Sequence, residues 1–212
     1  MTGGWKTHIV AVTRWWLGLD YLINGINWFH KIITPYPSMS DFVAYLPPHD
    51  IVGALIENGV LFPAAKAIEL IAGLALLADF LVPLALVLAM SVTVPVFVVD
   101  VLNPHPHLRA LLMGTGALTM NLFLLSAYFA HYRLLFTSHG IANLDTKGAL
   151  SVEETGFAGT LASIIRPCMV PWACISALLG MAMVIWLIVM ILQYVMNPLP
   201  LSAIHSLTPR VR

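Results

Sequence analysis

The sequence contains few charged residues for its length. Of the 212 residues, 9% are charged and 59% are hydrophobic, whereas a typical soluble domain carries about 25% charged residues. The mean hydropathy is correspondingly high, at +0.88. Because so few charges cannot coat a soluble globule of this size, lipid must contact much of the surface. The formal net charge of zero also argues against a nucleic-acid partner, which requires a basic face.

Cysteine is scarce, and the familiar catalytic motifs are missing. The spacing of Cys168 and Cys174 fits neither a CxxC redox motif nor a zinc site, so we interpret both as small packing residues. The sequence contains no P-loop, GxGxxG, HExxH or nucleophile triad, which leaves soluble-type enzyme chemistry without support. The first apolar segment includes Arg14, Asp20 and Asn24 and precedes no small-residue cleavage site. We therefore expect it to remain as the first helix rather than act as a signal peptide.

Five segments are apolar over the roughly 20 residues that a helix needs to cross a bilayer. They cover residues 8–29, 60–78, 80–102, 108–130 and 169–196. Only Asp79 and its neighbours separate the second segment from the third, which predicts a tight antiparallel hairpin. The predicted fold class is therefore all-α, a polytopic bundle of membrane helices. Lysine and arginine are spread almost evenly over the two sides, so they favour an inside N-terminus only weakly.

Two further segments are not predicted to cross the membrane. Residues 31–59 are rich in proline, tyrosine and aspartate, and we expect a capping loop there. Ser151 and Glu154 form a capping box before an apolar run to Ile165, which predicts a short amphipathic helix on the membrane surface. The expected organisation is a four-helix transmembrane core, an interfacial segment, and a fifth transmembrane helix with a tail, over residues 1–132, 133–168 and 169–212.

Polar side chains follow one face of the first predicted helix. Ionisable groups inside a span cost about 2.5–3.5 kcal/mol each on insertion scales and usually face the interior of a bundle. Steps of four, three and four residues form a polar stripe on the first helix, made of Asp20, Asn24, Asn27 and Lys31. This stripe can line a site for a headgroup, a proton path or a cofactor. It can also simply supply hydrogen bonds between helices, while Gly18 and Gly25 on the other face allow close helix approach.

The second predicted helix carries Lys66 and Glu69 one turn apart. Their spacing allows a local ion pair, which is the simpler interpretation. Alternatively, Glu69 takes up a proton or bonds a headgroup or a quinone carbonyl. In either case we expect Glu69 to face the polar stripe of the first helix rather than lipid.

A third polar group lies where the third span meets the fourth. Asp100 ends the third span, and His105, His107 and Arg109 follow within ten residues. These side chains can handle protons or hold a headgroup at one membrane face, or they can form a solvated loop. Haem or metal ligation is disfavoured, because two prolines bracket His105 in an extended turn. Membrane haem sites normally use inward-facing histidines on helices, so we predict no metal site.

Two helical motifs are similar to those of the DoxX-like membrane family. Residues 14–25 read RWWLGLDYLING and residues 67–77 read AIELIAGLALL. Family members open with Arg-x-x-Leu-Gly, a later glycine and a lysine, and then carry Glu-Leu-x-x-Gly on the second helix. The residues that match this pattern are Arg14, Gly18, Gly25, Lys31, Glu69 and Gly73.

The resemblance covers about residues 8–130 and implies a four-helix bundle in a bacterial or archaeal plasma membrane. Some relatives are subunits of a thiosulfate:quinone oxidoreductase, and others associate with redox-stress proteins. The long loop after the first helix, the segment over 133–167 and the fifth helix depart from the family pattern. These additions fit docking to a larger complex as well as they fit a redox role.

We therefore predict a multi-pass subunit of the cell inner (plasma) membrane that is associated with a quinone-linked redox system. Its expected partners are membrane lipid and other membrane or redox subunits. One alternative is a noncatalytic accessory subunit that docks onto a larger complex through the fifth helix and the segment before it. A small transporter or lipid-binding protein ranks last, because the polar stripe covers only about 16 Å of a ~30 Å core. The sequence leaves open whether the chain is itself an enzyme and whether it binds a cofactor.

Overall fold

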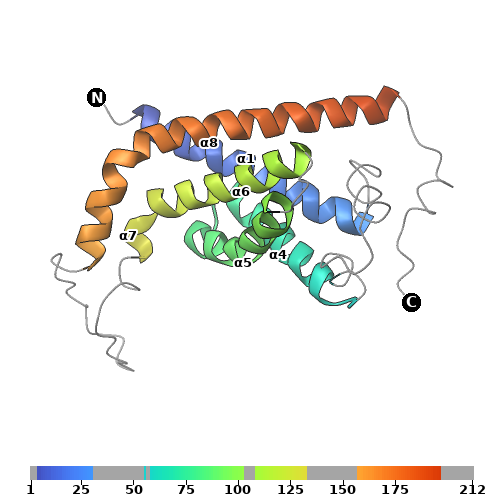
Figure 1. Ribbon diagram of the computed structural model, residues 1–212, viewed down its shortest axis with the longest axis horizontal. Coiled ribbons are helices and arrows are strands. Elements are labelled where there is room, and N and C mark those ends of the chain that lie inside the picture. Colours follow the sequence, from blue (N-terminus) through green and yellow to red (C-terminus); the bar gives the residue numbers. More distant parts are fainter. Residues whose placement is uncertain (1–3, 31–54, 56–57, 103–107, 133–156, 197–212) are drawn as a thin grey trace.

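The computed structural model describes residues 4–30, 55, 58–102, 108–132 and 157–196. Every regular element in these ranges is a helix, in agreement with the predicted all-α class, and Figure 1 shows their arrangement. The elements are α1 (Gly4–His30), α4 (Leu61–Leu77), α5 (Val82–Val101), α6 (Leu108–Ala127), α7 (Phe129–Tyr132) and α8 (Phe157–Met196).

Three of the described helices are long and apolar enough to cross a membrane. They are the spans Val82–Val101 in α5, Ala110–Ala127 in α6 and Gly159–Trp186 in α8. Their length and composition indicate a membrane protein. The other two predicted spans also form helices, but α4 has only 17 residues, and α1 contains the charged residues Arg14 and Asp20.

Helices α1 and α4 approach each other at glycines. A Cβ atom added to Gly73 would lie 2.6 Å from the backbone nitrogen of Leu22 and 2.8 Å from the carbonyl oxygen of Gly18. A Cβ atom on Gly25 would lie 2.9 Å from the Cβ of Leu70. These separations leave no room for a side chain, so the backbones can meet only because glycine is present. The close-approach face predicted for the first helix is therefore confirmed.

A hydrogen-bonded turn reverses the chain between α4 and α5. The N–H of Phe80 donates to the carbonyl of Ala75 over 2.9 Å. The N–H of Asp79 donates to the carbonyl of Leu76 over 3.4 Å, which completes the pair of bonds of a Schellman motif. Asp79 has a φ of 56°, in the left-handed region that glycine or asparagine usually occupies. The predicted tight hairpin is therefore present, and α4 and α5 contact each other.

Helix α8 runs without a break for 40 residues, and it bends in its N-terminal part (Figure 1). Pro167 and Pro171 lie inside it, and an internal proline bends a helix because it removes a backbone hydrogen bond. The sequence predicted a separate short helix up to Ile165 and a span beginning at Met169. That division is wrong, because one helix covers both parts. The predicted capping box lies outside the described residues.

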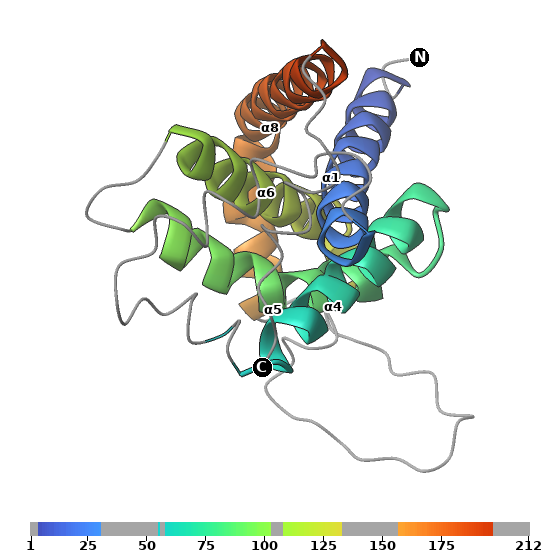
Figure 2. The same ribbon diagram turned by 90° about the vertical axis from the view of Figure 1, so that its right-hand side faces the viewer.

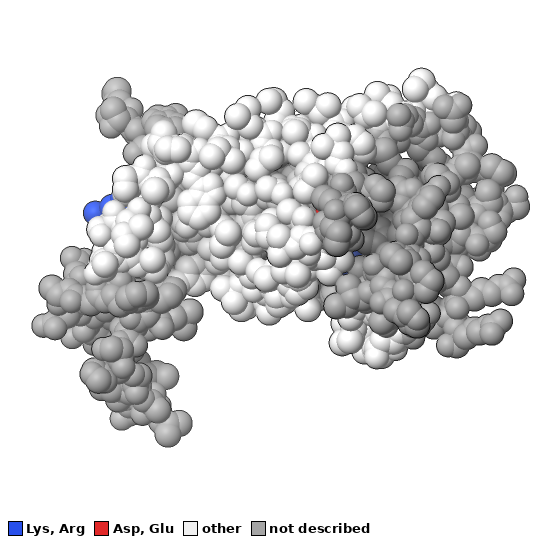
Figure 3. Space-filling model, in the orientation of Figure 1, with Lys and Arg blue, Asp and Glu red and all other residues white. Residues whose placement is uncertain are grey.

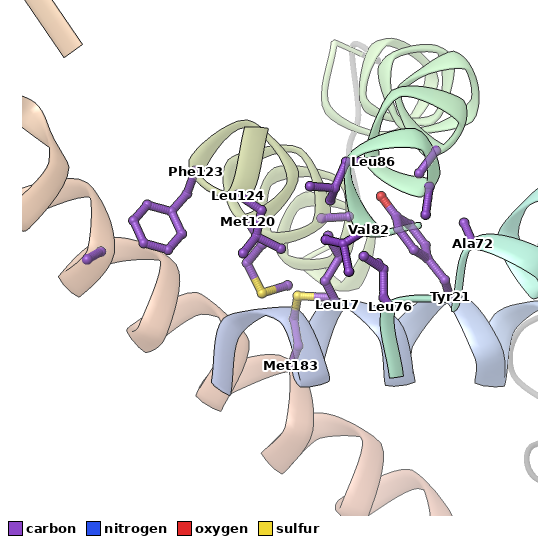
Figure 4. Close-up of a cluster of buried hydrophobic side chains, with 14 residues drawn as sticks. Leu17, Tyr21, Ala72, Leu76, Val82, Leu86, Met120, Phe123, Leu124 and Met183 are labelled. Carbon is purple, nitrogen blue, oxygen red and sulfur yellow. The ribbon is translucent and has the colours of Figure 1, made fainter. Parts of the chain in front are cut away.

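The core lies where α1, α4, α5, α6 and α8 converge (Figure 4). Each of these helices contributes fully or nearly fully buried apolar side chains, including Leu17, Leu76, Leu86, Met120, Phe123 and Met183. At one edge of the core, the Tyr132 hydroxyl donates to the carbonyl of Pro83 over 2.7 Å. Burial raises the pKa of Tyr132 to about 12, so this hydroxyl stays protonated and links α7 to the start of α5.

Apart from Thr160, Ser163 and Arg166 in its N-terminal part, the outer surface of α8 is apolar and largely uncovered. Its exposed side chains include Ile164, Ile175, Leu178, Met181, Ile185, Ile188 and Leu192. In Figure 3, charged side chains are almost missing from the described part of the face that is shown. Cys168 and Cys174, interpreted from the sequence as small packing residues, are free and exposed on the same helix.

Candidate polar site within the helix bundle

Three polar side chains from three helices meet inside the bundle. The Tyr21 hydroxyl of α1 lies 2.6 Å from Oγ1 of Thr93 on α5. Nδ2 of Asn121 on α6 donates to the Tyr21 hydroxyl over 3.0 Å and approaches Oγ1 of Thr93 at 3.5 Å. All three residues are buried, and Asn121 is completely inaccessible. Figure 4 shows the Tyr21 ring extending from α1 into the core, near Ala72 and Val82. We call Tyr21, Thr93 and Asn121 the buried triad.

The donor and the acceptor can be assigned for each hydroxyl hydrogen bond of the buried triad. The Thr93 hydroxyl donates to the carbonyl of Ala89 over 2.8 Å, which uses its only proton. The Tyr21 hydroxyl must then donate to Thr93, and it accepts from Asn121 in turn. The resulting chain of bonds begins at the Asn121 amide and ends at a peptide carbonyl.

One polar atom of the buried triad has no partner. Oδ1 of Asn121 is buried and forms no hydrogen bond with any part of the chain that the structure describes. A buried polar group without a partner costs roughly 1–3 kcal/mol. The triad therefore presents one open hydrogen-bond acceptor, while its hydroxyl donors are already used.

Lys66 and Glu69 form the second polar feature, a largely buried ion pair. Nζ of Lys66 lies 2.7 Å from Oε2 of Glu69, and their side chains are 17% and 7% exposed. Nζ also lies 5.5 Å from the centroid of the Phe62 ring, whose face attracts a cation. The ion pair that the sequence spacing allowed is present. Glu69 lies inside the bundle, but its described hydrogen-bond partner comes from its own helix rather than from the first helix.

The part of the polar stripe that the structure describes is bonded within α1. Nδ2 of Asn24 donates to Oδ1 of Asp20 over 3.1 Å, and both residues are half-buried. Asp20 is the sequence neighbour of Tyr21, so the stripe begins next to a member of the buried triad. The side chain of Asn27 lies outside the described residues, as does Lys31.

The group predicted at the α5–α6 junction is only partly described. Asp100 is half-buried near the end of α5 and has an interaction partner. His105 and His107 lie outside the described residues, and so does the side chain of Arg109. Across the described ranges, no three histidine, cysteine, aspartate or glutamate residues are placed to hold a metal ion.

A second ion pair connects α1 to the α4–α5 turn. The Arg14 guanidinium contacts the Asp79 carboxylate, with Arg14 almost fully buried and Asp79 exposed. This contact explains why an aspartate occupies the left-handed position of the turn, where its charge neutralises a buried arginine. The two ion pairs lie at opposite ends of the α1–α4 contact, and the glycines lie between them.

Five of the residues that carry the DoxX-like resemblance belong to this α1–α4 contact region. They are Arg14, Gly18, Gly25, Glu69 and Gly73. No family description, curated protein or solved structure matches the chain. Membership of the DoxX-like family stays a prediction from these motifs.

The buried triad was missing from the predicted site. Asn121 is an amide in an apolar segment, and it was not among the predicted site residues. Its actual partner, Tyr21, is 100 residues away in sequence, and helical periodicity carries no information on such pairs. Two sequence features could have indicated these residues. Tyr21 adjoins Asp20 in the polar stripe, and the Asn121 amide is costly inside a membrane span.

Proposed function

We propose that this protein is a multi-pass subunit of the inner (plasma) membrane and that it binds the quinone of a redox system. In this proposal α1 and α4 also cross the bilayer. Together with α5 and α6 they form a DoxX-like four-helix core, and α8 is a fifth span. The pairing of Arg14 with Asp79 and of Lys66 with Glu69 supports this assignment, because each pair lowers the cost of a charge in a bilayer.

The observation that carries the quinone proposal is the buried Glu69 carboxylate inside the helix bundle. A quinone has an apolar tail and needs only one or two polar contacts at its ring. Glu69 is almost fully buried and is paired with Lys66. A carboxyl group in such surroundings can bond a ring oxygen and exchange a proton with it. The electrons would come from a partner redox subunit.

The test is to purify the full chain in mild detergent and to quantify bound quinone by mass spectrometry. We expect close to one quinone per chain in the wild type. Glu69→Gln should retain about tenfold less, because a ring contact worth roughly 1.4 kcal/mol is weakened. Asp79→Asn is the matched control. It makes the same carboxylate-to-amide change at the other end of α4. It weakens the Arg14–Asp79 pair and so lowers the melting temperature, but the folded protein should retain quinone as the wild type does.

A noncatalytic accessory subunit is the second candidate, and the uncovered apolar surface of α8 favours it. A helix that packs on its neighbours along only part of its surface can dock a larger membrane subunit through the remainder. The same purification separates the two functions. Large membrane subunits without any quinone held by this chain would contradict the redox proposal and support the accessory role.

A further inference from the structure

Helix α8 is longer than one membrane crossing requires. Its 40 residues extend over about 60 Å at ~1.5 Å per residue, whereas the hydrocarbon core is ~30 Å thick. Even a tilt of about 40°, the upper end of the usual range, leaves a helix of this length longer than the core. Part of α8 must therefore lie outside the hydrocarbon. The bend near Pro167 and Pro171 separates residues 157–166, which we call the arm, from the longer part that follows (Figure 1).

The polar residues of α8 are concentrated in the arm. Thr160, Ser163 and Arg166 are exposed there, and a lipid-facing helix would have to bury all three against acyl chains. The opposite end of α8, residues 187–196, has one strongly polar residue in its sequence, Gln193. The part of α8 that leaves the hydrocarbon is therefore the arm, and the helix after the bend is the span.

The bend lies at one end of the bundle, beside residues that favour a membrane boundary. Figure 1 shows the arm turning away from the rest of α8 at the end of the bundle where α7 and the N-terminus of α1 lie. Just after the bend, Trp172 packs against the edge of the buried core, as does Tyr128 just after α6. Tryptophan and tyrosine are enriched where a membrane meets water. These residues therefore favour a membrane boundary near the bend.

We propose that the bend of α8 lies at the membrane boundary and that the arm lies among the lipid headgroups, where Arg166 binds phospholipid phosphate. Arg166 has no acidic partner among the residues that the structure describes, and a guanidinium binds phosphate through two parallel N–H donors. Ile164 is exposed beside the polar side chains, and the headgroup layer accommodates apolar and polar groups together. This inference goes beyond quinone binding and uses only the assignment of α8 as a span.

The two native cysteines provide the first measurement. Cys168 and Cys174 are the only cysteines in the chain, both are exposed, and they lie about 9 Å apart along the helix axis. Cys174→Ser and Cys168→Ser each leave one of them for a nitroxide spin label. In vesicles of phosphatidylethanolamine and phosphatidylglycerol, the label at Cys168 should be relaxed mainly by a water-soluble nickel chelate. The label at Cys174 should be relaxed mainly by oxygen, which concentrates in the hydrocarbon.

The second measurement places the arm itself. Ser163→Cys, made in a chain with both native cysteines changed to serine, carries the label on the exposed side of the arm. A lipid with a nickel chelate as its headgroup should relax this label more strongly than the soluble chelate does. The same lipid should relax the label at Cys174 only weakly, because that label lies deeper in the membrane.

Two variants test the contact between Arg166 and phosphate. Arg166→Glu reverses the charge and should weaken the attraction of the arm to anionic lipid by about tenfold or more. The nickel lipid should then relax the label at position 163 severalfold less. Arg166→Lys is the matched control, because it keeps the charge, and it should retain most of the relaxation. Melting curves in detergent check that both variants are folded.

The outcomes separate this inference from the proposed function. If the soluble chelate relaxes the label at Cys174 as strongly as the label at Cys168, the assignment of α8 as a fifth span fails together with the inference. If Cys174 is deep but the label at position 163 responds to oxygen or only to the soluble chelate, the inference alone fails. If Arg166→Glu changes nothing, contacts within the protein hold the arm, and phosphate binding by Arg166 is excluded. Quinone binding at Glu69 is measured separately and is affected by none of these results.

Discussion

Helices α1 and α8 are both long, but they are held in the bundle by different interactions. Helix α1 meets α4 backbone to backbone at glycines, and an ion pair lies at each end of that contact. Helix α8 lies beside α1 and α6 (Figure 2). Side chains meet glycines at these contacts, with Trp16 and Met120 against Gly180 of α8 and Met183 against Gly116 of α6. The first contact is rigid and charged, while the second is apolar and adaptable.

Polar contacts to neighbouring helices also distinguish the two regions. The hydroxyl of Ser176 and the indole nitrogen of Trp186, both on α8, are buried and have no hydrogen-bond partner in the described ranges. On α1, Oγ1 of Thr13 and Nε of Arg14 are also buried without a described partner. However, the Tyr21 hydroxyl bonds Thr93 of α5, and the Arg14 guanidinium contacts Asp79. Specific polar contacts thus join α1 to α5 and to the α4–α5 turn, whereas nothing described fixes α8 with the same specificity.

The largest effect is expected from removing one member of a buried ion pair. Lys66→Met leaves the Glu69 carboxylate buried without its cation, and breaking such a pair costs about 3 kcal/mol or more. Thermal unfolding in detergent should show a large loss of stability. The double variant Lys66→Met with Glu69→Gln removes the stranded charge and should recover most of that loss. A single variant as stable as the wild type would show that the pair does not stabilise the α1–α4 region.

A smaller effect is expected from adding one methyl group at each helix contact. Gly73→Ala forces a Cβ against the backbone of Leu22 and Gly18, and overpacking of this kind costs about 1–3 kcal/mol. Gly116→Ala meets the flexible end of Met183 instead, so its cost should stay below about 1 kcal/mol. Unfolding curves of the two variants give a direct comparison. Equal losses would contradict the distinction between a rigid and an adaptable contact.

The sequence predicted the local features of this molecule well. The hairpin at Asp79, the Lys66–Glu69 pair and the glycine face of α1 each depend on residues a few positions apart. Helical geometry alone relates such residues to one another. The all-helical class likewise follows from long apolar segments with few charges.

Features that depend on distant residues or on competing signals were not predicted. The Tyr21–Asn121 bond joins two helices that the sequence gives no means of orienting. The predicted boundary between the interfacial segment and the fifth helix falls at Pro167 and Cys168, and proline often ends a helix. The surrounding apolar residues carry the helix through Pro167 and Pro171, so the prolines bend it instead. Likewise, Cys168 and Cys174 are small apolar residues, but their spacing does not reveal which face of α8 is covered.

The smallest effect, and one of opposite sign, is expected at the unpaired hydroxyl of α8. Ser176→Ala removes a buried group without a described partner, so stability should stay unchanged or rise by up to about 1 kcal/mol. Thr93→Val is the contrasting change. It removes a hydroxyl that bonds Tyr21 and Ala89, and it should cost about 1 kcal/mol or more. Thermal unfolding of both variants measures the difference. If Ser176→Ala instead destabilises the protein as much as Thr93→Val does, Ser176 has a partner beyond the described residues. Helix α8 would then be held by a specific polar contact, as α1 is.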